Sequence, residues 1–142
     1  MKNTFTAEIS IFIQAPVSNV WKALVDPQQI KHYLFGTQVE SDWKEGSAIT
    51  YRGEWEGKTY EDKGTILSLV PEKIFSSTYW SSMSGKEDKP ENYATVTYKL
   101  SEENNGTRLT LTQDNIETEE SKKHSEGNWK AVLGKLKELV EK

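Results

Sequence analysis

Residues 129–140 read WKAVLGKLKELV and combine a helical period with a charged opposite face. The apolar side chains Trp129, Val132, Leu133, Leu136 and Val140 recur at the spacing of one stripe along an α-helix. Such a helix has to bury its apolar stripe against another layer of the protein. We therefore expect a long C-terminal helix that packs against a sheet.

Upstream of this helix, the chain alternates polar and apolar residues, which is typical of strands with one buried face. Residues 5–14 form the first such strand, with Phe5, Ala7, Ile9, Ile11 and Ile13 on one face. Two short helices follow, one over residues 16–25 and one from Asp26-Pro27 to just before Gly36. Proline suits the first turn of a helix, and Asp26 can cap the second of these helices.

Six further strands are expected between the two short helices and the C-terminal helix. They cover residues 37–41, 49–55, 59–70, 73–80 and 94–100, and a last segment around Leu109 and Leu111. The sequence Asn104-Asn105-Gly106 predicts a hairpin turn, because these residues accept the positive φ of tight turns. Short connections favour antiparallel pairing. The sequence thus predicts an α+β fold of order β-α-α-β6-α, as a single domain over residues 1–142.

Composition excludes several kinds of chemistry. The 142 residues include no cysteine, which excludes disulfides, thiolate metal sites and cysteine nucleophiles. The net charge of −4 argues against a nucleic-acid-binding protein, whose binding surface is basic. No segment is apolar over the length that spans a bilayer, and the opening Met1-Lys2-Asn3 is not followed by a signal-peptide core. We expect a cytoplasmic protein with no membrane insertion.

The sequence contains no recognisable catalytic or metal-binding motif. Its two histidines, His32 and His124, each follow a lysine and are interpreted as solvent-exposed. Neither a nucleophile elbow nor a glycine-rich phosphate loop occurs. We expect no metal, no cofactor and no catalytic residue.

Aromatic residues make up 11% of a chain that is only 35% hydrophobic, and many of them fall on faces that the alternation predicts to be inward. These are Tyr51, Trp55, Tyr60, Trp80, Tyr98 and Trp129, with Ile66 on the same face as Tyr60 and with Thr78 and Gln113 as polar companions. Two interpretations remain open. The rings fill the core, or they line a cavity in which their polar tips meet a ligand.

Carboxylates crowd the hairpin between residues 49 and 70. Glu54 and Glu56 alternate away from Tyr51 and are interpreted as the solvated face of the sheet. Asp62 instead lies on the aromatic face. Because a buried carboxylate needs a partner, we expect Asp62 to pair with Arg52 or with a hydroxyl.

Motifs along almost the whole chain resemble those of a known family. They are FTAEI and IQAP near the N-terminus, VWKAL with Asp26-Pro27, then YRGEW, GTI and Val70-Pro71 in the middle, and GTRL with WKAVL near the C-terminus. Their order and spacing resemble the activator of heat shock protein 90 ATPase homologue-like family, within the SRPBCC (START/birch-pollen-allergen-like) superfamily.

This resemblance implies a helix-grip fold, in which a curved antiparallel sheet wraps around the C-terminal helix and encloses a cavity. It implies binding of a small hydrophobic or aromatic ligand, such as a lipid, sterol, polyketide or flavonoid-like compound, without catalysis. We also expect a monomer. Two alternatives are a module that modulates a heat shock protein 90 type chaperone, in stress response, and a cyclase-like or hydrolase-like enzyme. The expected cavity residues are Tyr51, Trp55, Tyr60, Asp62, Ile66, Thr78, Trp80, Tyr98, Gln113 and Trp129.

Overall fold

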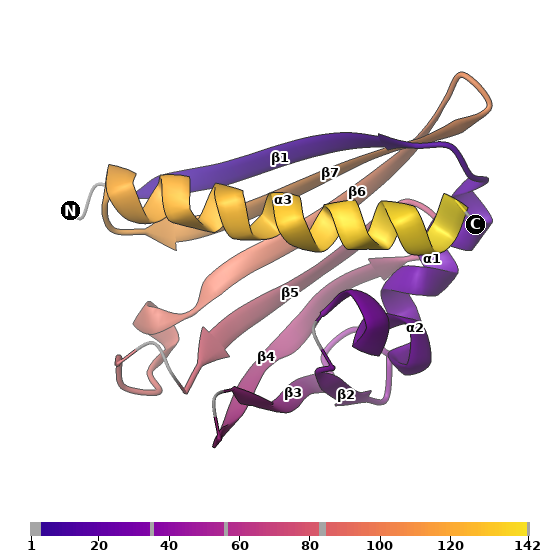
Figure 1. Cartoon of the computed structure of the whole chain (residues 1–142). Helices are drawn as coiled ribbons and strands as arrows, with labels where there is room; N and C mark the ends of the chain where they lie inside the picture. The colour runs from indigo at the N-terminus through magenta and orange to yellow at the C-terminus, as the bar shows by residue number, and fades with distance from the viewer. Residues whose placement is uncertain (1–3, 35, 56, 83–84, 142) are drawn as a thin grey trace.

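Seven antiparallel strands form one sheet in the computed structural model, in the order β1-β7-β6-β5-β4-β3-β2 (Figure 1). The structure describes residues 4–34, 36–55, 57–82 and 85–141, without the side chain of Trp55. The strands are β1 (Phe5–Ile13), β2 (Gln38–Ser41), β3 (Ala48–Trp55), β4 (Lys58–Val70), β5 (Ile74–Ser81), β6 (Ala94–Glu103) and β7 (Gly106–Ile116). The helices are α1 (Val17–Val25), α2 (Pro27–Tyr33) and α3 (Glu119–Glu141), with a 3-10 turn η1 (Pro90–Asn92). The order predicted from the sequence is confirmed.

The long helix α3 lies across one face of the sheet, with its C-terminal end close to α1 (Figure 1). Leu133 and Leu136 have no exposed surface, and Val132 is buried beside them. Trp129 and Val140 are partly exposed and pack against the same core. The stripe predicted over residues 129–140 is therefore the face that meets the sheet, although the helix begins ten residues earlier, at Glu119.

The core occupies the part of this layer nearest to α1 and to the first strands. Ile13 on β1 and Leu109 and Leu111 on β7 are fully buried there against α3. Side chains of this size pack to crystal-like density, so this half of the molecule is solid. Any internal space has to lie toward the other end of α3.

The two short helices are fixed to one another by their polar groups. Asp26, between α1 and α2, accepts a hydrogen bond from the Gln28 backbone N–H at 3.0 Å and a second from Gln29 Nε2 at 3.3 Å. The predicted cap is thus present. The buried Tyr33 hydroxyl of α2 donates to the Ala23 carbonyl of α1 at 2.9 Å. This pair of helices closes the core at one end of the sheet.

The ladder between β4 and β5 is irregular at the middle of the sheet. A Cβ atom added to Gly64 would lie 1.7 Å from the Thr78 carbonyl oxygen. Next to it, the Thr65 N–H donates to the Thr78 side-chain hydroxyl at 2.8 Å, and the register shifts between Ile66 and Ser68. Glycine and such irregularities allow a strand to bend and two backbones to approach closely.

Some kinds of site have no support in the part of the chain that the structure describes. Within those residues, no helix combines the length and apolarity needed to cross a membrane. In the same residues, no three His, Cys, Asp or Glu side chains gather as a group that could hold a metal ion.

Two glycine-to-alanine substitutions should have opposite effects on stability. Gly64→Ala should lower the free energy of unfolding by about 1–3 kcal/mol, because its Cβ would overlap backbone that cannot rotate away. Gly134→Ala should raise the free energy of unfolding by about 0.5–1 kcal/mol, because a Cβ at that helix position meets no atom within 4 Å. Urea denaturation of both variants measures this, and equal effects would contradict the close approach at Gly64.

Candidate functional site

A cavity of about 700 Å³ lies between the N-terminal half of α3 and the sheet. The helix contributes His124, Ser125, Asn128, Trp129 and Val132. These positions follow one face of the helix, one turn after another. Three of the five are polar, whereas the fully buried residues in the core half of α3 are leucines. The helix therefore stops filling the interior where its inward side chains change from leucine to polar residues.

The sheet contributes a wall of tyrosines separated by small residues. Its lining side chains are Tyr51, Tyr60, Asp62, Ser77, Tyr79, Ser81, Val96, Tyr98 and Gln113, and they come from β3 to β7. Leu34, Thr37 and the exposed Glu54 complete the rim. The two serines on β5 leave room between the tyrosine rings of neighbouring strands. The lining thus combines five aromatic side chains, four tyrosines and Trp129, with polar groups on both the sheet and the helix.

Asp62 is the charged group set deepest in this wall, with only 8% of its surface exposed. The Tyr79 hydroxyl donates to Asp62 Oδ2 at 2.5 Å. The other carboxylate oxygen, Oδ1, is buried and has no hydrogen-bond partner among the described residues. The Tyr51 ring meets the Tyr79 ring edge to face, with centroids 5.9 Å apart. The carboxylate is therefore enclosed by rings and satisfied on one side only.

The tyrosines around Asp62 hold their protons strongly. Burial is the main cause that raises the pKa of Tyr79, and the negative charge of Asp62 raises this pKa further. Burial likewise raises the pKa of Tyr51, with Ser77 acting in the opposite direction and Asp62 adding to the rise. Burial also raises the pKa of Tyr98. Each hydroxyl is thus a neutral donor at physiological pH.

Two further polar pairs orient the walls. Trp129 Nε1 on α3 donates to Gln113 Oε1 on β7 at 2.8 Å, which ties the helix to the sheet across the cavity. On the opposite side, the hydroxyls of Tyr60 and Thr37 lie 2.5 Å apart. Buried tryptophan and tyrosine normally find such partners for their polar tips. The rings are therefore held in fixed positions.

Six of the predicted cavity residues do line the cavity. They are Tyr51, Tyr60, Asp62, Tyr98, Gln113 and Trp129. The expected hydroxyl partner of Asp62 is Tyr79, whereas Arg52 pairs with Glu40 and Glu61 on the other face of the sheet. Trp55 was also expected here, but its side chain lies outside the described residues.

Three other predicted positions lie elsewhere. Thr78 and Trp80 point to the opposite face of the sheet, so the prediction that they line the cavity is wrong. There the Trp80 ring stacks on Tyr93 and lies under Lys63 Nζ, 5.7 Å from the ring centroid. Ile66 does face inward, but it is packed in the solid core, 1% exposed, and does not line the cavity.

Tyr79, Ser77 and Ser81 are lining residues that the sequence reasoning missed, because it assigned the wrong face to β5. Adjacent Tyr79 and Trp80 give both faces of this strand an aromatic residue, so alternation alone does not identify the inward one. Glu54 and His124 are exposed, as expected, yet they lie at the rim of the cavity. The helical period that places Trp129 and Val132 inward also places Ser125 and Asn128 near that face, which was a usable signal.

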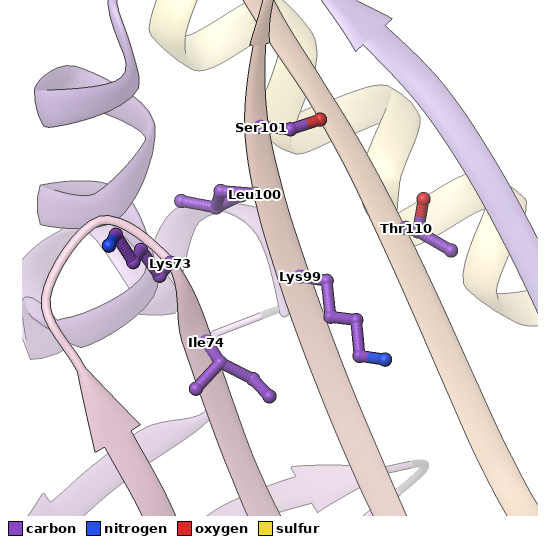
Figure 2. Close-up of a pocket in the computed structure, with 6 residues that line it drawn as sticks. All are labelled: Lys73, Ile74, Lys99, Leu100, Ser101 and Thr110. Carbon is purple, nitrogen blue, oxygen red and sulfur yellow. The ribbon is translucent and has the colours of Figure 1, made fainter.

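A second hollow, of about 430 Å³, lies on the sheet face that α3 does not cover (Figure 2). It is lined by Lys73, Ile74, Lys99, Leu100, Ser101 and Thr110. Figure 2 shows the side chains of Lys99 and Ile74 on the near side of the strands, and α3 lies behind these strands. This hollow shares no residue with the cavity under α3.

The sheet, the covering helix and the cavity between them are the features of a helix-grip fold. A family model described as Activator of Hsp90 ATPase homolog 1-like protein matches residues 14–141. The chain belongs to this family. The family lies in the SRPBCC superfamily, as the sequence motifs indicated. A comparison with curated proteins gives no match.

Solved structures share the fold of this family member. The solution structure of ChR145 from Cytophaga hutchinsonii is 50% identical, with a TM-score of 0.87 over 99% of this chain and 97% of that one. CalU16 from Micromonospora echinospora is 24% identical, with a TM-score of 0.73 over 98% and 87% of the two chains. The Aha1 dimer from Colwellia psychrerythraea is 20% identical, with a TM-score of 0.76 over 96% of each chain. The last two show likeness of fold alone.

Alkaline pH should destabilise this family member. Burial raises the pKa values of Tyr51, Tyr79 and Tyr98 above the ordinary 10.0, whereas in the unfolded chain these hydroxyls ionise near pH 10. Above that pH the folded state binds more protons than the unfolded state, so the free energy of unfolding falls as pH rises. Below it, these groups add no pH dependence.

Denaturant unfolding at several pH values, combined with phenolate ultraviolet absorbance, measures this alkaline effect. We expect the phenolate signal of the buried tyrosines to rise only together with loss of native circular dichroism. Ionisation of all six tyrosines near pH 10 in a still-folded protein would contradict their burial.

Proposed function

We propose that this protein binds a small, mostly apolar ligand with an aromatic or fused-ring body in the cavity under α3, without catalysis. One observation carries the proposal, namely a cavity of about 700 Å³ with a mostly apolar surface, to which four tyrosines and a tryptophan contribute. Ligand pockets of proteins have about 300–1,000 Å³ and are predominantly apolar, with a few placed polar groups. The cavity has both properties.

The shape of the walls favours flat, rigid ligands. The rings of Tyr98 and Trp129 meet edge to face, with centroids 6.3 Å apart, and the rings of Tyr51 and Tyr79 do the same. Such rings are rigid surfaces that offer faces and edges to another π-system. Polyketide-like or flavonoid-like compounds fit this wall better than flexible acyl chains do, and sterols are intermediate.

The protonation of the tyrosines supports binding more than catalysis. A general base has to lose its proton near the working pH, whereas burial raises the pKa of Tyr79 and keeps this hydroxyl a donor. Tyr79 already donates a hydrogen bond to Asp62. The pair therefore suits recognition of a ligand group better than the cyclase-like or hydrolase-like activity considered from the sequence.

Amide-resolved NMR against a small panel of flavone, a naphthalene derivative, a sterol and a fatty acid tests the proposal. We expect a ring compound to shift the signals of Tyr51, Tyr79, Tyr98 and Trp129 at saturable concentrations. Asn128→Trp, at an exposed lining position, should weaken this binding at least about tenfold by filling the mouth.

Lys130→Trp provides the matched control, because this residue is exposed on α3 and does not line the cavity. It should leave the affinity for the ring compound unchanged. Equal loss in both variants, or shifts confined to the far face of the sheet, would contradict binding in the cavity.

A chaperone partner is the second candidate, because the matching family model is described as an activator of the Hsp90 ATPase. Under the cavity proposal, adding this protein to a heat shock protein 90 chaperone should leave the rate of ATP hydrolysis unchanged. A colorimetric phosphate assay measures this rate. A dose-dependent rise, preserved in Asn128→Trp, would favour the chaperone function instead.

The cytoplasmic location, the stress-related role and the monomeric state stay predictions from the sequence. Size-exclusion chromatography with light scattering tests the last of these. The structurally similar protein from Colwellia psychrerythraea is described as a dimer, which makes this measurement worthwhile.

A further inference from the structure

The described lining of the cavity contains two carboxylates and no lysine or arginine. Among the described residues that line it, the carboxylates are Asp62 and Glu54, His124 is the single histidine, and none is a lysine or an arginine. Asp62 is the deep carboxylate and Glu54 the exposed one at the rim. A ligand that enters this space therefore meets acidic groups first at the mouth and again inside.

Cationic side chains close to Asp62 in sequence or across the strand pair lie on the other face of the sheet. Lys63, the next residue, forms an ion pair with Asp88 and lies over the Trp80 ring. Arg52, beside Tyr51 on the adjacent strand, is bonded to Glu61 and Glu40 at 3.0 and 3.3 Å. Because successive residues of a strand point to opposite faces, neither cation can reach Asp62 without a register slip.

Among the residues that the structure describes, the buried Asp62 carboxylate thus has one hydrogen-bond partner, the neutral Tyr79 hydroxyl. Removing a carboxylate from water is costly unless an opposite charge or several hydrogen bonds compensate. Here Oδ2 accepts from Tyr79, while Oδ1 has no partner among the described residues. A positively charged ligand group beside Oδ1 would offset the cost of burying this carboxylate.

The surrounding rings are also suited to a cation. Tyr51 and Tyr79 enclose Asp62, and Tyr98 and Trp129 form the adjoining wall. A cation within about 6 Å of the face of such a ring is attracted by its quadrupole, more strongly when it is desolvated. A carboxylate set among tyrosine and tryptophan rings can hold an organic ammonium group by both effects.

We propose that the cavity selects ligands that carry a protonated amine on an aromatic or fused-ring body, with the ammonium group bound at Asp62. This inference rests on the proposed function, since it specifies the ligand of the same cavity. The ring body contacts the tyrosine and tryptophan walls. The ammonium group donates hydrogen bonds to the Asp62 carboxylate and neutralises it.

Three ligands with one ring body and different end groups test this inference. They are 2-(1-naphthyl)ethylamine, 2-(1-naphthyl)ethanol and 1-naphthylacetate, titrated into the native protein and followed by amide-resolved NMR. We expect the amine to bind at least about tenfold more tightly than the alcohol, because it adds a charge-assisted hydrogen bond. The carboxylate should bind more weakly than the alcohol, because like charges repel.

Asp62→Asn keeps the shape of the side chain and removes its charge. In this variant the amine should lose its advantage, so that the ratio of the amine and alcohol affinities falls to about one. Glu102→Gln removes the same charge at an exposed position outside the cavity and should preserve the preference for the amine. The comparison of the three ligands on the native protein decides the question even if Asp62→Asn does not fold.

The outcomes separate this inference from the proposed function. Equal binding of amine and alcohol, or tighter binding of the carboxylate, would overturn the charge preference and leave the cavity function intact. If Glu102→Gln also loses the preference for the amine, the preference comes from the overall charge of the protein. That result would overturn the inference too. If none of the three ligands shifts the lining residues and the ring panel also fails, both proposals fall.

Discussion

One helix has to cover the inner face of a seven-stranded sheet. Whether the space between them is filled depends on which side chains the helix turns toward the sheet. In the C-terminal half of α3, Leu133 and Leu136 are fully buried and fill the space as densely as protein cores usually do. In the N-terminal half, the side chains toward the sheet include His124, Ser125 and Asn128, which are too polar to complete a core. The cavity follows from this change of composition along a single helix.

The aromatic residues connect the two halves. Phe75 is buried in the core and stacks on Tyr98, with centroids 5.7 Å apart, and Tyr98 meets Trp129 at the cavity. Core filling and cavity lining, the two interpretations that the sequence left open, are thus both present in one continuous set of rings. The core thus supports the Tyr98 ring, which forms part of the cavity wall.

Regular periods made most of the fold predictable, and the failures occurred where the two faces of an element look alike. The stripe of α3 is one-sided, and its inward face was predicted correctly. On β1 the predicted inward face is buried at Ala7, Ile9 and Ile13, whereas Phe5, before a register irregularity, is exposed. In β5, Trp80 packs on the outer face of the sheet against Tyr93 and Lys63, and the sequence alone does not show these contacts. For Asn128, the helical period indicated the face of α3, but it did not show whether a polar side chain there meets a cavity or solvent.

Strand alternation also determines where the charges lie. Asp62 and Tyr51 point inward, so their sequence neighbours Lys63 and Arg52 point outward and find carboxylates there. A one-residue slip would exchange these faces, but it would also expose Ile49 and Ile66, which are almost completely buried. The apolar core thus holds the register, and the register keeps a carboxylate inside the cavity and its potential partners outside. An apolar residue at position 62 would fill this register equally well but would leave the Tyr79 hydroxyl without its acceptor, so the carboxylate and the tyrosine belong together.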